Sequence, residues 1–156
     1  MVNKVKVLDA VLAKLEEELR VQLKGQAAAA EGATHAEARA ETKWDTCGLE
    51  QSYLARGLAR QCEALAIQVE ELRAFKPTAS SDKPIGFGAL IEIEMDGDRD
   101  LFFLLDCGGG TEAEVDGWKI TVITPESPLG AVLLGKASGD RYTIGTGSGG
   151  MILSVE

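Results

Sequence analysis

The sequence predicts an α+β protein, in which an N-terminal antiparallel α-helical coiled-coil hairpin precedes a small antiparallel β domain with one short helix. Apolar residues recur at alternating steps of three and four in the first half, which is a coiled-coil period. In the second half they recur at steps of two, which is a strand period. A proline-bearing polar segment separates the halves. We therefore expect an arm over residues 1–76, a linker over 77–84 and a β domain over 85–156.

Composition and charge limit the partners. The chain has 156 residues, of which 45% are hydrophobic and 26% are charged, as in globular proteins. The net charge is -9, and residues 76–156 carry 6 Lys and Arg against 13 Asp and Glu. Duplex DNA and anionic membranes would be repelled by this half. We expect neither membrane binding nor direct sequence-specific DNA binding, and a basic protein surface fits better.

Cysteine and histidine usage predicts no metal site. Cys47, Cys62 and Cys107 show no Cys-x-x-Cys spacing, and His35 is the single histidine, so a zinc site is not expected. The sequence shows neither a signal-peptide core nor about 20 consecutive apolar residues that could span a bilayer. We expect a cytoplasmic monomer with reduced thiols, without a cofactor of its own.

The first helix follows from its seam, the stripe of residues that faces the partner helix. Large apolar residues are followed in the same register by two glutamines and then by alanines. We expect the helix to run to about Thr42, with a thin end where the seam is small. The seam positions are Val5, Leu8, Leu12, Leu15, Leu19, Gln22, Gln26, Ala29, Ala33, Ala36 and Ala40.

An alternative ends this helix early. Gly32 would terminate it, and Thr34 would cap a new helix, with Glu37 completing a capping box. The uninterrupted reading keeps Gly32 inside the helix, at a cost of about 1 kcal/mol.

The second helix resumes the seam and runs to about Arg73. Two long helices joined by a short loop lie antiparallel, so we place the tip of the hairpin near residues 43–50. Trp44 and Tyr53 flank this turn and could either pack together or anchor a partner. The second seam consists of Leu54, Leu58, Cys62, Leu65, Val69 and Leu72.

The β domain is predicted from alternation and turn residues. Ile91, Ile93 and Met95 alternate with glutamates, and the pair at 96–97, Asp-Gly, favours a hairpin turn toward the apolar run 101–105. Further strands are expected over 118–123, 141–144 and 151–155.

A short helix is expected between two of these strands. Ser127 can cap it, Pro128 suits its first position and Gly135 can end it.

Three motifs are better explained by ordinary structure than by ligands. The segment from Gly130 to Lys136 comes within one residue of a P-loop, but Ala137 lacks the hydroxyl that would hold magnesium. The acids at 96, 98 and 100 fit an acidic hairpin better than a calcium loop. The glycine runs at 108–110 and 145–150 lack the context of a dinucleotide fingerprint, so we expect plain loops.

Two features together resemble the bacterial Gre transcript-cleavage factors, which are transcription elongation factors. One is the helical-hairpin arm. The other is the segment 119–136, in which Ser127-Pro128 and Gly135-Lys136 resemble the family's Ser-Pro to Gly-Lys signature. The resemblance covers nearly the whole chain. It implies a coiled-coil arm, an FKBP-like domain and docking at the secondary channel of bacterial RNA polymerase. The docking residues would be Ser127, Pro128, Leu129, Leu133 and Leu134.

The tip departs from the family's pattern. In that family it reads Gly-Asp-Leu-x-Glu-Asn-Ala-Glu-Tyr, and its Asp and first Glu help to hold a magnesium ion of the polymerase. When Tyr53 is matched to the family's tyrosine, the Asp place falls on Thr46 and the Glu place on Leu49. When Gly32 is matched to its glycine, the two places fall on alanines. Neither match supplies the pair of carboxylates.

Two acids lie one residue from the expected places. In the Tyr53 match these are Asp45 and Glu50, and one residue is about 100° around a helix. Asp45 and Glu50 could replace the family's two acids only if the turn has a different conformation. The protein would bind no magnesium of its own, and these acids would contact the ion that the polymerase holds.

The sequence therefore predicts a transcription factor that binds the secondary channel of RNA polymerase and modulates elongation or initiation, without normal stimulation of transcript cleavage. It would not be an enzyme, and no catalytic or metal-binding residue is assigned. One alternative is cleavage through the shifted acids. Another is an FKBP-like protein-binding module such as a regulator of nucleoside diphosphate kinase. The residues expected to face the polymerase active centre are Trp44, Asp45, Thr46, Leu49, Glu50 and Tyr53.

Overall fold

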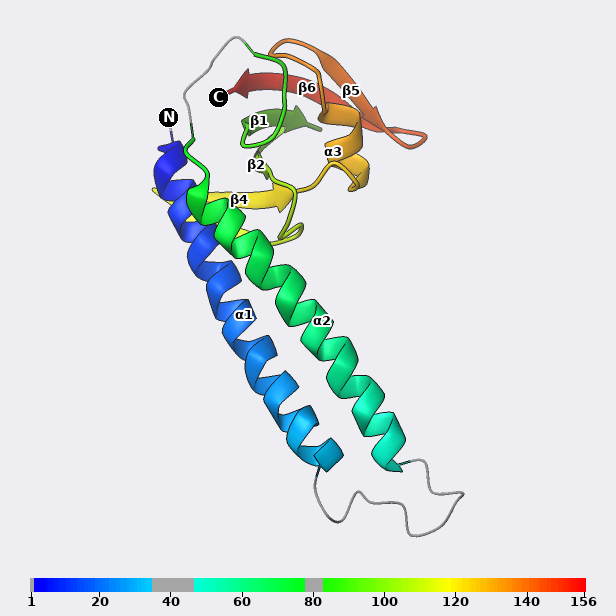
Figure 1. Ribbon diagram of the computed structural model, residues 1–156. Coiled ribbons are helices and arrows are strands. Elements are labelled where there is room, and N and C mark those ends of the chain that lie inside the picture. The colour runs from blue at the N-terminus through cyan, green and yellow to red at the C-terminus, as the bar shows by residue number, and fades with distance from the viewer. Residues whose placement is uncertain (1, 35–46, 78–82) are drawn as a thin grey trace. The chain divides into compact units, whose positions relative to one another are not determined.

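The computed structural model describes residues 2–34, 47–77 and 83–156. Two compact units are formed, one by residues 15–74 and one by residues 1–14 together with 75–156; the sequence had placed residues 1–14 with the arm. No helix in the described ranges is long and apolar enough to cross a membrane. The elements (Figure 1) are α1 (Lys4–Thr34), α2 (Cys47–Ala74), β1 (Leu90–Met95), β2 (Asp98–Leu104), β3 (Glu112–Val115), β4 (Trp118–Ile123), α3 (Pro128–Leu133), β5 (Arg141–Ile144) and β6 (Ser148–Val155).

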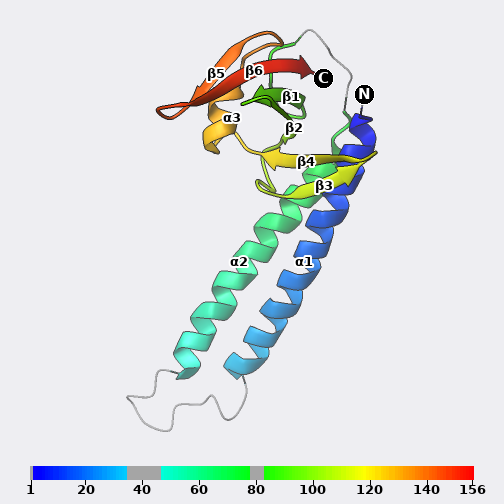
Figure 2. The same ribbon diagram turned by 180° about the vertical axis from the view of Figure 1, so that it is seen from behind.

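The first unit is the predicted antiparallel hairpin. The later part of α1 and the whole of α2 run side by side in opposite directions (Figures 1 and 2). Arg73, near the end of α2, donates to Glu16 of α1 from Nη2 at 2.7 Å and from Nε at 2.9 Å, and it also pairs with Glu70 on its own helix. The hydrogen bond to Glu16 is the largest cause that raises the Arg73 pKa above its ordinary value.

The predicted seam is confirmed in part. Leu15 of α1 is fully buried, and the later seam positions of α2 are buried as well: Cys62, Leu65, Val69 and Leu72. Leu54, which we expected in the seam, is 56% exposed, so that prediction was wrong. The alanine end of α1 offers little apolar surface to cover a leucine, and Ala29 there is itself only half-buried.

The helix ends differ slightly from the predicted ones. α1 continues through Gly32, so the alternative that ends it there is wrong. α2 ends at Ala74, one residue beyond the predicted end, and it begins at Cys47, so Gly48 belongs to its first turn and not to the loop. The predicted continuation of α1 to Thr42 and the seam residues Ala36 and Ala40 lie outside the described residues.

The second unit is built on a six-stranded sheet in the order β3-β4-β2-β1-β6-β5. All neighbouring strands are antiparallel except β2 and β4, which pair in parallel. Strands β4 and β5 have the predicted bounds, whereas β3 was missed because Val115 is its only large apolar residue. Gly149 and Gly150, predicted to lie in a loop, belong to β6; a Cβ at Gly150 would lie 1.8 Å from the Glu94 carbonyl oxygen.

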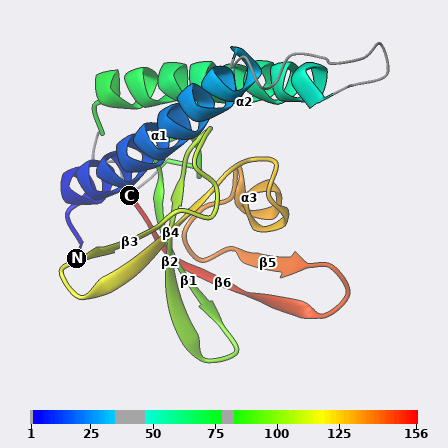
Figure 3. The same cartoon turned by 90° about the horizontal axis from the view of Figure 1, so that it is seen from below.

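Apolar side chains are buried on both faces of this sheet. One face, with Ile91 and Ile93 of β1, packs with Leu133 of α3 in a core cluster, and α3 contacts β5, beside which it lies in Figure 3. The alternate residues of the strands point to the other face, where Phe103 and Val122 are fully buried.

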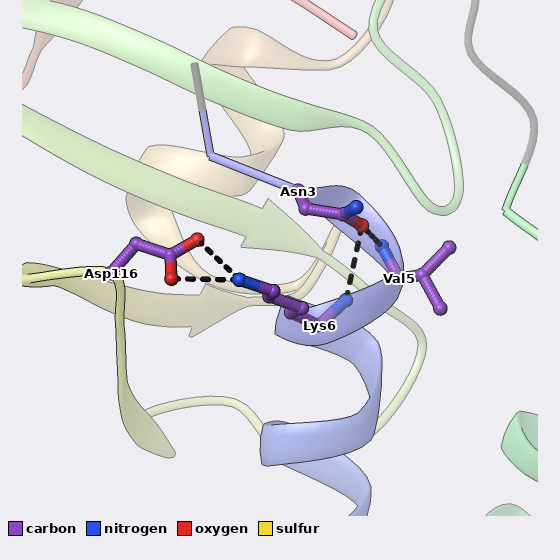
Figure 4. Close-up of polar contacts among 4 residues, drawn as sticks. All are labelled: Asn3, Val5, Lys6 and Asp116. Atoms are coloured by element: carbon purple, nitrogen blue, oxygen red, sulfur yellow. Dashed lines mark hydrogen bonds and ion pairs between the residues drawn. The ribbon is translucent and has the colours of Figure 1, made fainter.

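The first turn of α1 is held to the β domain by polar contacts (Figure 4). Asn3 caps the helix, since its Oδ1 accepts from the backbone N–H of Val5 at 2.9 Å and of Lys6 at 3.3 Å. Lys6 Nζ lies 2.9 and 3.2 Å from the two carboxylate oxygens of Asp116, and Lys4 Nζ donates to the Glu156 backbone oxygen at 2.9 Å. Burial, opposed by the negative charge of Glu156, lowers the Lys4 pKa below its ordinary value.

This packing shifts the buried stripe of α1. Val5, the first predicted seam residue, is 51% exposed, whereas Val7 and Val11 are fully buried. The prediction for Val5 was wrong, although Leu8 of the predicted seam is buried. The first 14 residues form a unit with the β domain, so the seam of a two-helix hairpin does not alone decide which of their side chains are buried.

The shift is tested by two matched substitutions. Val7→Ala should lower the free energy of unfolding by about 2 kcal/mol, through lost burial and the cavity left behind, whereas Val5→Ala should change it by less than about 0.5 kcal/mol. Urea denaturation of both variants measures the difference. Equal costs would contradict the observed stripe.

One core side chain carries an unsatisfied polar atom. Tyr142 is 3% exposed, and among the described residues its hydroxyl has no hydrogen-bond partner. The hydroxyl lies 2.9 Å from the position that a Cβ would take at Gly150. Burial raises the pKa of Tyr142, and the nearby charges of Asp100 and Asp96 raise it further.

Tyr142→Phe should therefore be neutral or stabilising by about 1 kcal/mol, because it removes a buried hydroxyl that lacks a partner. Since the folded-state pKa is raised, the unfolded chain loses the phenolic proton first, and wild-type stability should fall as the pH rises above about 10. The variant should lack this part of the decline. Denaturation between pH 8 and pH 11 measures it, and identical pH profiles would contradict the assignment.

Candidate functional site

The segment that carries the Ser-Pro to Gly-Lys signature forms α3 and its two ends. Ser127 is the N-cap: its Oγ accepts from the Gly130 backbone N–H at 3.0 Å and donates to the Thr124 carbonyl oxygen at 2.7 Å. Pro128 occupies the first helical position, where no backbone donor is needed. A Cβ at Gly130 would lie 1.9 Å from the Thr124 carbonyl oxygen. The first turn of α3 therefore fits against the preceding loop only with glycine at this position.

The other end of the signature is also structural. Gly135 has a φ of +78°, a conformation that favours glycine. Its backbone N–H donates to the Ile85 carbonyl oxygen at 2.8 Å, and the Ile85 N–H donates to the Lys136 carbonyl oxygen at 2.7 Å. The Gly-Lys pair thus ties the end of α3 to the first residues of the β domain. Because Gly130 is buried and the Gly135 N–H is already bonded, this segment does not form a phosphate cradle.

The predicted docking residues differ in exposure. Pro128 is exposed and Leu134 is 48% exposed, whereas Ser127 is half-buried and Leu129 packs partly against the core. Leu133 is fully buried, which contradicts its predicted place at a docking surface, because the inward face of a helix this short is needed for the core.

A small exposed surface remains on the outer side of α3. Ala131, which sequence reasoning did not single out, is exposed and lies three residues from both Pro128 and Leu134, a spacing that places side chains on neighbouring positions of a helix. We call Pro128, Ala131 and Leu134 the α3 rim. The i, i+3 spacing from Pro128 could have identified Ala131 from the sequence.

Half of the predicted tip residues can be placed. Trp44, Asp45 and Thr46, like His35, lie outside the described residues. Leu49, Glu50 and Tyr53 lie in the first turns of α2.

All three described tip residues are exposed. Leu49 is 57% exposed and Tyr53 is 61% exposed, and their i, i+4 spacing puts them on one side of the helix. Glu50 is exposed as well, about 100° around the helix from Leu49.

Within 2–34, 47–77 and 83–156, no three His, Cys, Asp or Glu side chains gather in a way that could hold a metal ion. Cys62 and Cys107 are buried thiols outside any disulfide. Asp96, Asp98 and Asp100 are exposed along the hairpin of β1 and β2.

Comparison with known proteins confirms the resemblance to the Gre factors. The chain is 26% identical over 125 residues to the transcription elongation factor GreA of Thermomicrobium roseum, and the match covers 80% of this chain and 74% of that protein. No protein-family model matches the chain.

Two solved structures are also similar. GreA factor homolog 1 (Gfh1) of Thermus thermophilus is 18% identical, with a TM-score of 0.37 over 94% of this chain and 95% of that chain. Gfh1 of Thermus aquaticus is 19% identical, with a TM-score of 0.37 over 94% of each chain. The resemblance to the Gre factors therefore rests on the sequence match to the GreA of Thermomicrobium roseum.

The structural role of the signature is tested at Gly130. Gly130→Ala should lower the free energy of unfolding by about 2 kcal/mol or more, because the new methyl group meets a backbone oxygen that cannot move aside. Gly147→Ala is the control, since a Cβ at Gly147 meets nothing within 4 Å, and it should cost less than about 0.5 kcal/mol. Thermal and urea unfolding measure both. A well-tolerated Gly130→Ala would show that α3 does not need this close approach.

Proposed function

We propose that this Gre-like chain binds bacterial RNA polymerase at its secondary channel and modulates elongation or initiation, without normal stimulation of transcript cleavage and without enzymatic activity of its own. The observation that carries the proposal is the match over 125 residues to a protein named as a transcription elongation factor. That protein is named as a factor that acts in transcription, which agrees with our proposal that this chain is not itself an enzyme.

The α3 rim supports a docking role for the β domain. It presents one apolar side chain at each end. The helix α3 that carries it is held at its start by the Ser127 cap and at its end by the backbone hydrogen bonds of Gly135 and Lys136 with Ile85. A rigid, exposed apolar patch loses little conformational entropy when a partner covers it. The rim is small, so its contribution would come from a few well-packed contacts.

Charge favours a basic partner surface around the rim. Residues 76–156 carry 6 basic against 13 acidic side chains, and Glu126, directly before the cap, is exposed. Complementary charge speeds association and orients the partners more than it raises affinity. Binding should therefore weaken as the salt concentration rises.

The described part of the tip supports loss of normal cleavage stimulation. Magnesium takes hard oxygen ligands, and the place of the family's glutamate is occupied by Leu49, an exposed apolar residue. Glu50 would have to turn by about 100° to replace it. Leu49 and Tyr53 on one side of α2 offer apolar and aromatic contact instead, which suits binding in a channel.

The docking proposal is tested by placing a charge in the rim. Leu134→Asp should weaken binding to core RNA polymerase at least tenfold, because it would bury a carboxylate in an apolar contact. Met151→Asp is the control, and it makes the same change in charge. Met151 is 40% exposed on β6 and alternates with Ile152, which packs in the core cluster with Leu133, so Met151 points to the sheet face opposite α3. Fluorescence anisotropy of labelled protein titrated with core polymerase measures both affinities.

Two results would contradict the proposal. Wild-type protein that does not bind core polymerase at micromolar concentration would remove the function itself. Equal losses of affinity for Leu134→Asp and Met151→Asp would leave the function standing but would place the docking surface elsewhere.

A further inference from the structure

A pocket of about 280 Å³ opens on the sheet face opposite α3. Leu90 and Glu92 of β1 line it, and they alternate with Ile91 and Ile93, which pack on the side of α3. The pocket is therefore separate from the α3 rim. It is lined by Val2, Leu90, Glu92, Leu101, Trp118, Ser154 and Glu156.

The floor of the pocket is apolar and one wall is aromatic. Val2, Leu90 and Leu101 are each less than 10% exposed, so they form a fixed surface. Trp118, the first residue of β4, is 41% exposed, so part of its indole ring remains open to a ligand. Such a floor would bind the methylene groups of a long side chain, and an accessible indole binds a cation on its face.

Glu92 places a carboxylate beside this surface. Its side chain is 25% exposed, and the contacts that the structure gives it are long: Arg99 Nη1 lies 3.4 Å from Oε1, and Ser154 Oγ lies 3.3 Å from Oε2. Charge-assisted hydrogen bonds are normally about 2.7–2.9 Å. A partly buried carboxylate with only such contacts can gain free energy from a shorter bond to a cation.

The two lysines at the start of α1 are engaged elsewhere. Lys4 donates to the Glu156 backbone oxygen, and Lys6 binds Asp116. Arg99, which is 61% exposed, forms an ion pair with Glu92 at 3.4 Å, so a ligand guanidinium would have to replace or share this long contact.

We propose that this pocket binds an arginine side chain of a partner protein, with the guanidinium between the Glu92 carboxylate and the Trp118 ring. A guanidinium is planar, stacks on an indole and donates two parallel hydrogen bonds to a carboxylate. The alkyl part of the side chain would lie on Leu90 and Leu101. The acidic half of the chain attracts a basic segment, whereas an anion would be repelled.

The site forms a second interaction surface that does not depend on binding to RNA polymerase. All of its residues belong to the unit formed by residues 1–14 and 75–156. The test therefore needs only the full chain and a small ligand.

The experiment uses Trp118 as the reporter. In the full-length Trp44→Phe protein Trp118 is the single tryptophan, and its fluorescence is followed during titration with the peptide acetyl-Gly-Arg-Gly-amide. We expect a saturable change with a dissociation constant on the order of 1 mM, as for a ligand of this size. The same peptide with citrulline, which keeps the shape but lacks the charge, should bind at least tenfold more weakly, and the lysine peptide at least threefold more weakly.

Two substitutions in the same background locate the site. Glu92→Gln keeps the side-chain volume and should weaken arginine-peptide binding at least tenfold. Glu114→Gln makes the same change in charge at an exposed residue of β3 outside the pocket and should leave binding unchanged.

The proposal is overturned if the arginine peptide gives no saturable change up to about 20 mM, or if citrulline or lysine peptides bind as well as it does. It is also overturned if Glu92→Gln, shown by circular dichroism to be folded, binds like the parent protein. Equal weakening by Glu114→Gln would replace a specific site with a general effect of charge. The comparison of peptides on unchanged protein tests the idea even if Glu92→Gln does not fold.

Discussion

The close approach of Gly130 to the Thr124 carbonyl oxygen is the constraint on which the β domain depends. It allows the first turn of α3 to pack against the preceding loop. There the Ser127 hydroxyl accepts a hydrogen bond from the Gly130 N–H of the helix and donates one to the Thr124 carbonyl oxygen of the loop. With α3 held there, Leu133 completes the core, and Gly135 and Lys136 pair with Ile85. The residues that resemble a family signature are therefore explained by conformation and packing. Their consequence for function is indirect, since they leave the α3 rim exposed and rigid.

The hairpin follows a different constraint, the size of its seam residues. Large apolar side chains bury one another along the later part of α2 and at Leu15 of α1, and Arg73 adds an ion pair with Glu16 there. Toward the other end the seam of α1 changes to alanine, and Leu54 is left exposed. This end gains less from burial. Leu49 and Tyr53 are exposed at this end.

The sequence was most informative where a pattern is local. The cap, the first position and the terminating glycine of α3 could be read directly, and the strands at 118–123 and 141–144 have the predicted bounds. Periodicity shows that a stripe is buried but not what covers it. Val5 was misplaced for that reason, because the start of α1 forms a unit with the β domain. The pocket at Glu92 and Trp118 could not be predicted either, since it joins residues from four strands and the N-terminus.

We propose that the chain is a Gre-like factor that binds RNA polymerase without the usual pair of tip acids. The most direct test is a transcript-cleavage assay on a backtracked elongation complex, with this protein alone and in competition with an authentic Gre cleavage factor. We expect no cleavage above background by the protein alone, and a concentration-dependent slowing of the cleavage that the authentic factor stimulates. Rapid cleavage by the protein alone, or no effect on the authentic factor at saturating concentration, would contradict it.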